Sequence, residues 1–127
     1  MNVLALEPYY GGSHQAFLDG WIARSRHQWT TLTLPPHKWK WRMRHASVTF
    51  AESARQRGAA DRPWNVLFAS DMLNLAEFLG LAEEAVRRVP AVAYFHESQF
   101  TYPVRRSDAR DLHFALTNTT TALAAAQ

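Results

Sequence analysis

Four short runs of apolar, β-branched or aromatic residues, separated by longer segments with helical spacing, constrain the fold of this 127-residue chain most strongly. The runs cover residues 2–6, 29–34, 65–69 and 91–95 and have the length and composition of buried strands. Strands that are joined by helices run parallel, because each crossover returns the chain to the same end of the sheet. The sequence therefore predicts an α/β fold of the Rossmann-like, doubly wound kind, with a mostly parallel sheet and helices on both of its faces.

The first two intervening segments carry helical patterns. Ser13 is placed to cap a first helix, whose predicted inward face consists of Phe17, Leu18, Trp21 and Ile22. After the second run, Pro35 and Pro36 predict a loop that continues through residue 44. A second helical stripe begins at Met43 and is expected to end at Gly58.

The remaining segments predict two further helices. Ser70 or Asp71 is expected to cap the helix that follows the third run. The last helix is expected to present one apolar side, which consists of Leu112, Ala115, Leu116, Thr119 and Leu123.

The bulk composition predicts one globular domain in a reducing compartment. Hydrophobic residues make up 47% of the chain and charged residues 20%, and cysteine is absent. The sequence contains neither an apolar run long enough to span a membrane nor a basic leader. We therefore expect a cytoplasmic protein without stable membrane insertion; the sequence does not predict its oligomeric state.

Polar and aromatic residues follow each predicted strand, at residues 9–14, 37–44, 70–74 and 96–102. In doubly wound sheets, ligands bind in the crevice outside the carboxyl ends of the strands. The sequence therefore predicts that these four segments meet in one site, although loops are polar by default.

A glycine turn follows the first strand and consists of Gly11, Gly12, Ser13 and His14. Free backbone N–H groups at a helix start favour an anion, and glycine lets a ligand approach the backbone. The turn thus fits a phosphate or a sugar hydroxyl, while a simple turn with a helix cap is the alternative. It lacks the lysine of a Walker loop and the third glycine of the dinucleotide fingerprint.

Cations alternate with aromatic rings after the second strand, in Lys38, Trp39, Lys40, Trp41, Arg42 and Arg44. No acidic residue occurs between Asp19 and Glu52, so the local charge is positive. Such a segment can hold RNA, with the charges along phosphates and the rings on bases. A membrane-surface patch and a solvated loop with its tryptophans in the core remain alternatives.

His96 and Glu97 follow the fourth strand and are the candidate catalytic pair, because a histidine beside a carboxylate can act as an acid or a base. A structural histidine is the alternative. The pattern of a zinc protease is excluded, since Phe100 stands where its second histidine would be. We expect no metal site.

Together these motifs resemble the N-terminal domain of tRNA-queuosine mannosyltransferases. The resemblance runs almost end to end and rests on residues 9–14 (YYGGSH), 34–42 (LPPHKWKWR), 72–78 (MLNLAEF), 94–104 (YFHESQFTYPV) and 110–111 (RD). One departure is Ser98, where the family is expected to have asparagine.

The resemblance implies a retaining GT-B glycosyltransferase that transfers mannose from GDP-mannose to queuosine in a tRNA anticodon, without a metal or another cofactor. Residues 11–14 would face the reaction centre, His96 would approach the sugar or the acceptor hydroxyl, and residues 38–44 would meet RNA. The further substrate-binding candidates are Asn74, Gln99, Tyr102, Arg110 and Asp111; Asn74, Arg110 and Asp111 could equally be helix caps.

In GT-B enzymes the N-terminal half receives the acceptor and the C-terminal half holds most of the nucleotide sugar. Residues 1–127 are therefore expected to be a partial N-terminal domain that lacks the donor-binding domain and is inactive by itself. Two other readings stay open: an RNA-binding module of similar fold without catalysis, and half of a membrane-associated glycosyltransferase with a lipid acceptor.

Overall fold

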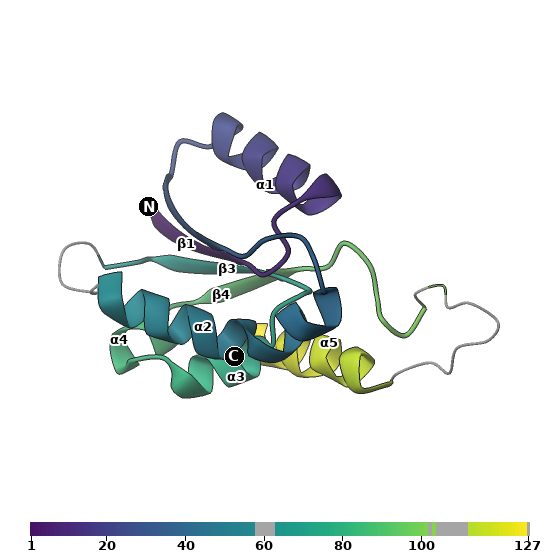
Figure 1. The fold of residues 1–127 in the computed structure, drawn as a ribbon. Coiled ribbons are helices and arrows are strands. Elements are labelled where there is room, and N and C mark those ends of the chain that lie inside the picture. Colours follow the sequence, from purple (N-terminus) through teal and green to yellow (C-terminus); the bar gives the residue numbers. More distant parts are fainter. Residues whose placement is uncertain (58–62, 102, 104–111, 127) are drawn as a thin grey trace.

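The computed structural model, which describes residues 1–57, 63–101, 103 and 112–126, contains a four-stranded parallel sheet (Figure 1). Its strands are β1 (Asn2–Glu7), β2 (Gln28–Thr33), β3 (Val66–Ser70) and β4 (Ala91–Tyr94). The strand order is β2-β1-β3-β4, and every neighbouring pair is parallel. The four predicted strands and their parallel arrangement are thus confirmed, with ends that differ by one residue.

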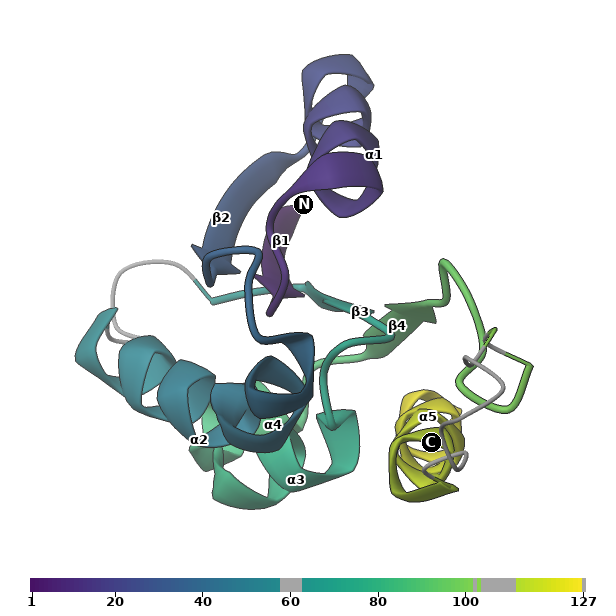
Figure 2. The same cartoon turned by 45° about the vertical axis from the view of Figure 1, so that its right-hand side comes forward.

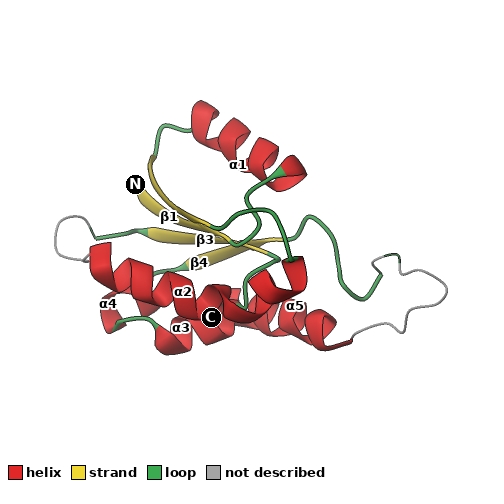
Figure 3. Ribbon diagram, viewed as in Figure 1, coloured by secondary structure: helices red, strands yellow, loops and turns green. Residues whose placement is uncertain are grey.

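Helices cover both faces of the sheet. α1 (Gly12–Arg24) lies on one face, while α2 (Trp39–Arg57), α3 (Leu75–Leu81), α4 (Glu84–Arg87) and α5 (Leu112–Ala125) lie on the other (Figures 1 and 2). Figure 3 shows that each described strand is followed by a helix, which is the pattern of a doubly wound sheet. The predicted α/β, Rossmann-like fold class is confirmed.

The core divides into two parts because successive side chains of a strand point to opposite faces. Leu4, Leu6 and Leu67 are fully buried toward the layer of α2 to α5. Val3 and Phe68 belong to a smaller cluster that packs against α1. This alternation explains why the strands appear in the sequence as nearly continuous apolar runs.

Two predictions about α1 are wrong. Its N-cap is Gly11, and no side chain forms a cap hydrogen bond, so Ser13 is not the cap. Trp21, expected in the inward face, is 41% exposed, whereas Leu18 is buried. Trp21 contacts Trp29 and Phe68 in T-shaped arrangements, and α1 is the one described helix on this face of the sheet.

The loop expected through residue 44 is wrong, because α2 begins at Trp39. Lys38 has a positive φ of 53°, and its carbonyl accepts hydrogen bonds from the backbone N–H groups of Trp41 and Arg42. The chain therefore turns at Lys38 and enters the helix directly. Gly58, the predicted helix end, lies outside the described residues.

Asn74 caps α3, and its Oδ1 accepts a hydrogen bond from Glu77 N–H at 3.1 Å. The prediction of Ser70 or Asp71 as the cap is wrong. Ser70 is the last residue of β3 and is fully buried, and Asp71 is 1% exposed beyond the strand end. Both side chains therefore point into the protein and not toward the helix start.

The predicted inward face of α5 is wrong except for Ala115, which is buried as expected. The buried residues are Phe114, Ala115, Thr117, Asn118 and Thr121, while Leu112, Leu116 and Leu123 are 56%, 58% and 64% exposed. Asn118 and Thr121 form hydrogen bonds to the backbone that follows β3, which fixes the rotation of the helix. Within the described part of the chain, no helix is both long and apolar enough to cross a membrane.

Candidate functional site

A crevice of about 110 Å³ lies at the carboxyl ends of β1, β3 and β4. Its lining residues are Tyr9, His14, Trp39, Met72, Glu97 and Gln99. The glycine turn contributes His14, the start of α2 contributes Trp39, and the segment after β4 contributes Glu97 and Gln99. The structure thus brings parts of these predicted segments together, while their functional roles stay predictions.

Glu7, the last residue of β1, contacts His14, which lines the crevice. Glu7 is 1% exposed and His14 is 8% exposed. The Oε2 atom of Glu7 lies 3.2 Å from Nδ1 of His14, and Oε1 accepts a hydrogen bond from Tyr9 N–H at 2.8 Å. Burial, the largest single influence, lowers the pKa of His14, but the hydrogen bond and charge of Glu7, together with the charges of Asp71 and Glu97, outweigh it, so that the pKa is raised.

Asp71 is a second buried carboxylate beside this pair. Burial raises its pKa from 3.8 to about 6, although the charge of His14 opposes the shift. Its Oδ1 accepts a long hydrogen bond of 3.4 Å from His96 N–H. Its Oδ2 is buried without a hydrogen-bond partner among the described residues. An ionised Asp71 is therefore poorly solvated, and carboxylates with pKa values shifted in this way are concentrated at functional sites.

His96 lies beside His14, and the two ring centroids are 4.0 Å apart with an interplanar angle of 36°. Burial lowers the pKa of His96, and the charge of His14 lowers it further. Its Nε2 is buried and unpartnered among the residues that the structure describes. His96 is not among the residues that line the crevice, whereas its neighbour Glu97 is.

Glu7, His14 and His96 each place one potential ligand atom within 4.8 Å of the others. Both oxygens of Glu7 are already engaged, one with Tyr9 N–H and one with His14. This geometry is that of a carboxylate that orients a histidine, and the expectation of no metal stays a prediction.

The glycine turn brings two chain segments close together. Gly11 is buried, and a Cβ atom added there would lie 2.4 Å from Cβ and from Cγ of Pro36. Gly12 has a φ of +55°, a conformation that favours glycine, and faces open space. Gly11 therefore permits the contact between the turn and the Pro35-Pro36 segment, which leads to Trp39 at the crevice.

Substitution of Gly11 by alanine is expected to lower the free energy of unfolding by about 1 to 3 kcal/mol, because the added methyl overlaps the Pro36 ring. Gly80 lies inside α3 with no atom within 4 Å of an added Cβ. As a matched control, Gly80→Ala should raise stability by about 0.5 to 1 kcal/mol. Urea titration of both variants measures these changes, and a Gly11→Ala protein as stable as the wild type would contradict the steric argument.

Arg42, predicted to bind RNA, is held by the protein itself. Its Nε donates to Pro35 O at 3.1 Å, and its two terminal nitrogens donate to His45 at 3.1 Å and His37 at 3.0 Å. Three groups thus occupy its guanidinium. The structure gives Arg42 a role in fixing the start of α2 to the preceding loop.

The other members of the cation and tryptophan segment divide into two groups. Trp39 is half-buried, packs on Phe114 with ring centroids 5.1 Å apart, and lines the crevice. Trp41 is 61% exposed. Lys38, Lys40 and Arg44 are also exposed. Near the start of α2, the residues that can meet a polyanion are therefore these three cations and Trp41.

Of the remaining predicted site residues, the structure describes Asn74 and Gln99 but not the other three. Asn74 serves as the α3 cap, and Gln99 is buried with its backbone N–H bonded to Asn118 Oδ1 at 3.0 Å. Tyr102, Arg110 and Asp111 lie outside the described residues. Glu7 was not predicted; the signal for it was a carboxylate at the end of an apolar strand, seven residues before a histidine.

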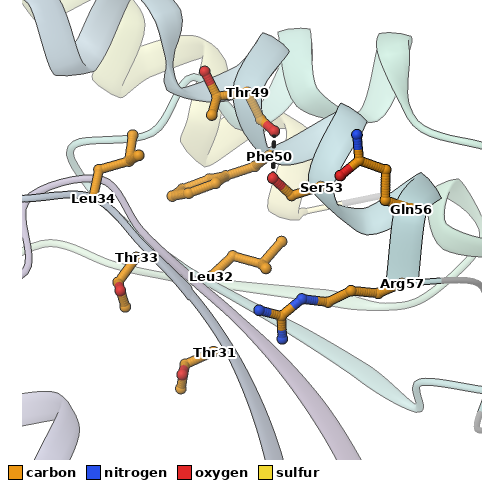
Figure 4. Close-up of a pocket in the computed structure, with 9 residues that line it drawn as sticks. All are labelled: Thr31, Leu32, Thr33, Leu34, Thr49, Phe50, Ser53, Gln56 and Arg57. Atoms are coloured by element: carbon orange, nitrogen blue, oxygen red, sulfur yellow. Dashed lines mark hydrogen bonds between the residues drawn. The ribbon is translucent and has the colours of Figure 1, made fainter.

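A second hollow of about 330 Å³ lies between β2 and the C-terminal half of α2 (Figure 4). The side chain of Arg57 extends toward the strand, and Ser53 donates a hydrogen bond to Thr49 O. This hollow is larger than the crevice, but its described lining residues include no histidine and no carboxylate. We therefore place the candidate site at the crevice, where buried titratable groups meet.

The fold and the crevice define the class of protein: a Rossmann-like domain with a crevice at the carboxyl edge of its sheet, where domains of this kind bind ligands. The chain belongs to the family described as tRNA-queuosine alpha-mannosyltransferase N-terminal, whose model matches residues 2–127. It is 37% identical over 127 residues to a tRNA-queuosine alpha-mannosyltransferase of Drosophila melanogaster, a match that covers 98% of this chain and 32% of that relative. The chain thus spans about a third of the length of this relative. No solved structure matches significantly.

Proposed function

We propose that this chain is the acceptor-side domain of a cytoplasmic, retaining GT-B glycosyltransferase that transfers mannose from GDP-mannose to queuosine in tRNA. A donor-binding domain outside these 127 residues would hold most of the nucleotide sugar, without a metal or another cofactor, and this domain alone would be inactive. The observation that carries the proposal is the crevice at the carboxyl edge of the sheet in a member of this family.

The chemistry of the crevice suits a small polyol ring. Hydrogen-bonding groups come from His14, Glu97 and Gln99, and the aromatic rings of Tyr9 and Trp39 provide flat apolar surfaces. A volume of about 110 Å³ matches one ring better than a whole nucleotide. These properties support binding of the cyclopentene ring of queuosine or of the sugar transferred to it.

The charge beside the crevice supports an RNA acceptor. Lys38, Lys40 and Arg44 are exposed at the start of α2, whose residue Trp39 lines the crevice. Phosphates of a tRNA could contact these cations while a flipped base enters the crevice. The same surface also favours a second candidate, an RNA-binding module without catalysis, because its cations do not require the crevice.

Mass analysis of tRNA separates the two candidates. Queuosine-containing tRNA is incubated with the full-length protein and one of several nucleotide sugars, and the modified nucleoside is then weighed. Mannose transfer predicts a hexose adduct with GDP-mannose and with no other donor, and only in tRNA that contains queuosine. Tight binding without any adduct would support the RNA-binding module instead.

Trp41→Ala is expected to weaken tRNA binding by about 1 to 3 kcal/mol, because an exposed indole among cations can stack on a base. Trp39→Ala, by contrast, should also lower stability, since that ring packs on Phe114 as well as lining the crevice. Filter binding at fixed salt and urea unfolding measure the two effects. Unchanged tRNA affinity in Trp41→Ala would remove this residue from the interface.

A further inference from the structure

The environment of Glu7 identifies which side of the His14 ring is available to a ligand. Glu7 Oε2 lies 3.2 Å from Nδ1 of His14, so Nδ1 is engaged on the protein side of the ring. His14 nevertheless lines the crevice, and its second ring nitrogen, Nε2, is the one left to face a bound molecule. A histidine whose Nδ1–H donates to a carboxylate has a fixed ring orientation and a fixed neutral tautomer.

The burial of Glu7 argues for a role beyond packing. A carboxylate that is 1% exposed is costly, and an apolar side chain at the end of β1 would suit the core better. Its two oxygens accept hydrogen bonds from Tyr9 N–H and from His14, both on the segment that forms the crevice wall. Glu7 is therefore built to hold this segment.

The other groups around His14 do not replace Glu7. Asp71 follows β3, and His96 and Glu97 follow β4; all three influence the charge of His14 or respond to it. No hydrogen bond joins the His14 ring to Asp71, His96 or Glu97 among the described residues. The Tyr9 ring meets His14 edge-on at 6.0 Å. Glu7 is thus the group that sets the orientation of the His14 ring.

We propose that Glu7 is a positioning residue that holds the His14 imidazole with Nε2 toward the crevice, and that His14, not His96, makes the contact with an oxygen of the bound substrate. The substrate part of this inference rests on the proposed glycosyltransferase function. The orientation of His14 by Glu7 is independent of that function and can be tested on this chain.

The first test uses ¹⁵N NMR of the histidine rings in the 127-residue chain. In the wild type, neutral His14 is expected to carry its proton on Nδ1. In Glu7→Gln this preference should weaken, because the one amide oxygen cannot accept from both Tyr9 N–H and His14, and the pKa of His14 should fall below its wild-type value, because the negative charge is gone. Glu97→Gln is the matched control, since Glu97 influences His14 only through its charge and should leave the tautomer unchanged.

Two outcomes would overturn the inference: a wild-type His14 with its proton on Nε2, or equal effects of Glu7→Gln and Glu97→Gln. The wild-type measurement alone decides the first of these, so the test holds even if the Glu7 variant does not fold.

The second test measures mannose transfer to queuosine-containing tRNA by the full-length protein. Glu7→Gln is expected to lower kcat by roughly 10- to 100-fold and to leave the KM for tRNA unchanged, as for other groups that orient a histidine. His14→Gln should have a similar effect, and the double variant should be no slower than His14→Gln alone. If the reductions in kcat of the two single variants multiplied in the double variant, Glu7 would not act through His14.

This design distinguishes two failures. A wild-type protein that transfers no mannose would refute the proposed function, while the NMR result would still decide the role of Glu7. Normal transfer by both single variants would refute only the inference about His14 and Glu7.

Discussion

Replacing Thr121 by valine is expected to lower the free energy of unfolding by about 2 to 4 kcal/mol, because two buried backbone groups lose their partner. The fully buried Oγ1 of Thr121 donates to Leu73 O at 2.8 Å and accepts from Leu75 N–H at 3.1 Å. Leu75 is the first residue of α3, so its N–H has no acceptor within that helix. Valine preserves the shape of the side chain and removes both bonds.

Urea unfolding measures this loss, and Thr119→Val provides the control. Thr119 is exposed on the same helix, and its hydroxyl donates only to Ala115 O, a carbonyl of the preceding turn. Its replacement should change stability by no more than about 0.5 kcal/mol. If the two variants unfolded at the same urea concentration, Thr121 would not link α5 to the backbone after β3.

Asp71→Asn is expected to stabilise the protein above pH 7 by roughly 3 kcal/mol, since the pKa of Asp71 is raised from 3.8 to about 6 and each unit corresponds to about 1.4 kcal/mol. The folded state binds this proton more tightly than the unfolded state, so the wild type loses stability as the pH rises from about 4 to about 6. Asparagine cannot ionise and keeps an oxygen that can accept from His96 N–H. The gain should therefore disappear below pH 4.

Urea unfolding of both proteins at a series of pH values between 3 and 8 tests this expectation. Glu77→Gln, at an exposed position of α3, is the control and should shift stability by at most about 0.5 kcal/mol at every pH. A difference between wild type and Asp71→Asn that stays constant with pH would show that the effect does not come from ionisation.

The strands were predictable because a parallel strand is buried on both faces and its sequence is almost continuously apolar. The rotation of α5 was not predictable from hydrophobic spacing. Its buried side is chosen by Asn118 and Thr121, whose hydrogen-bond partners are backbone groups far away in the sequence. The start of α2 was missed for a related reason: the apolar spacing of Met43 extends back to Trp39, but the cations between them suggested a loop.

The site was predictable to the extent that its residues follow strands. His14, Glu97 and Gln99 occupy such positions and line the crevice, as does Trp39. Glu7 belongs to the strand itself, and its role becomes visible only when α1 folds back and places His14 against it. Arg42 was predicted to bind RNA because its neighbours in the sequence are cations and tryptophans. In the structure its guanidinium instead forms hydrogen bonds with Pro35, His37 and His45.

The close approach of the His14 and His96 rings has a consequence for how this region takes up protons. With 4.0 Å between the ring centroids, a proton on His14 repels a second proton from His96; burial and this charge lower the pKa of His96, whereas the nearby carboxylates, Glu7 foremost, raise the pKa of His14. Acidification should therefore charge the pair in two separate steps. Between these two steps, one of the two rings carries a positive charge. The histidine pair therefore presents the same charge to an incoming substrate over that range of pH.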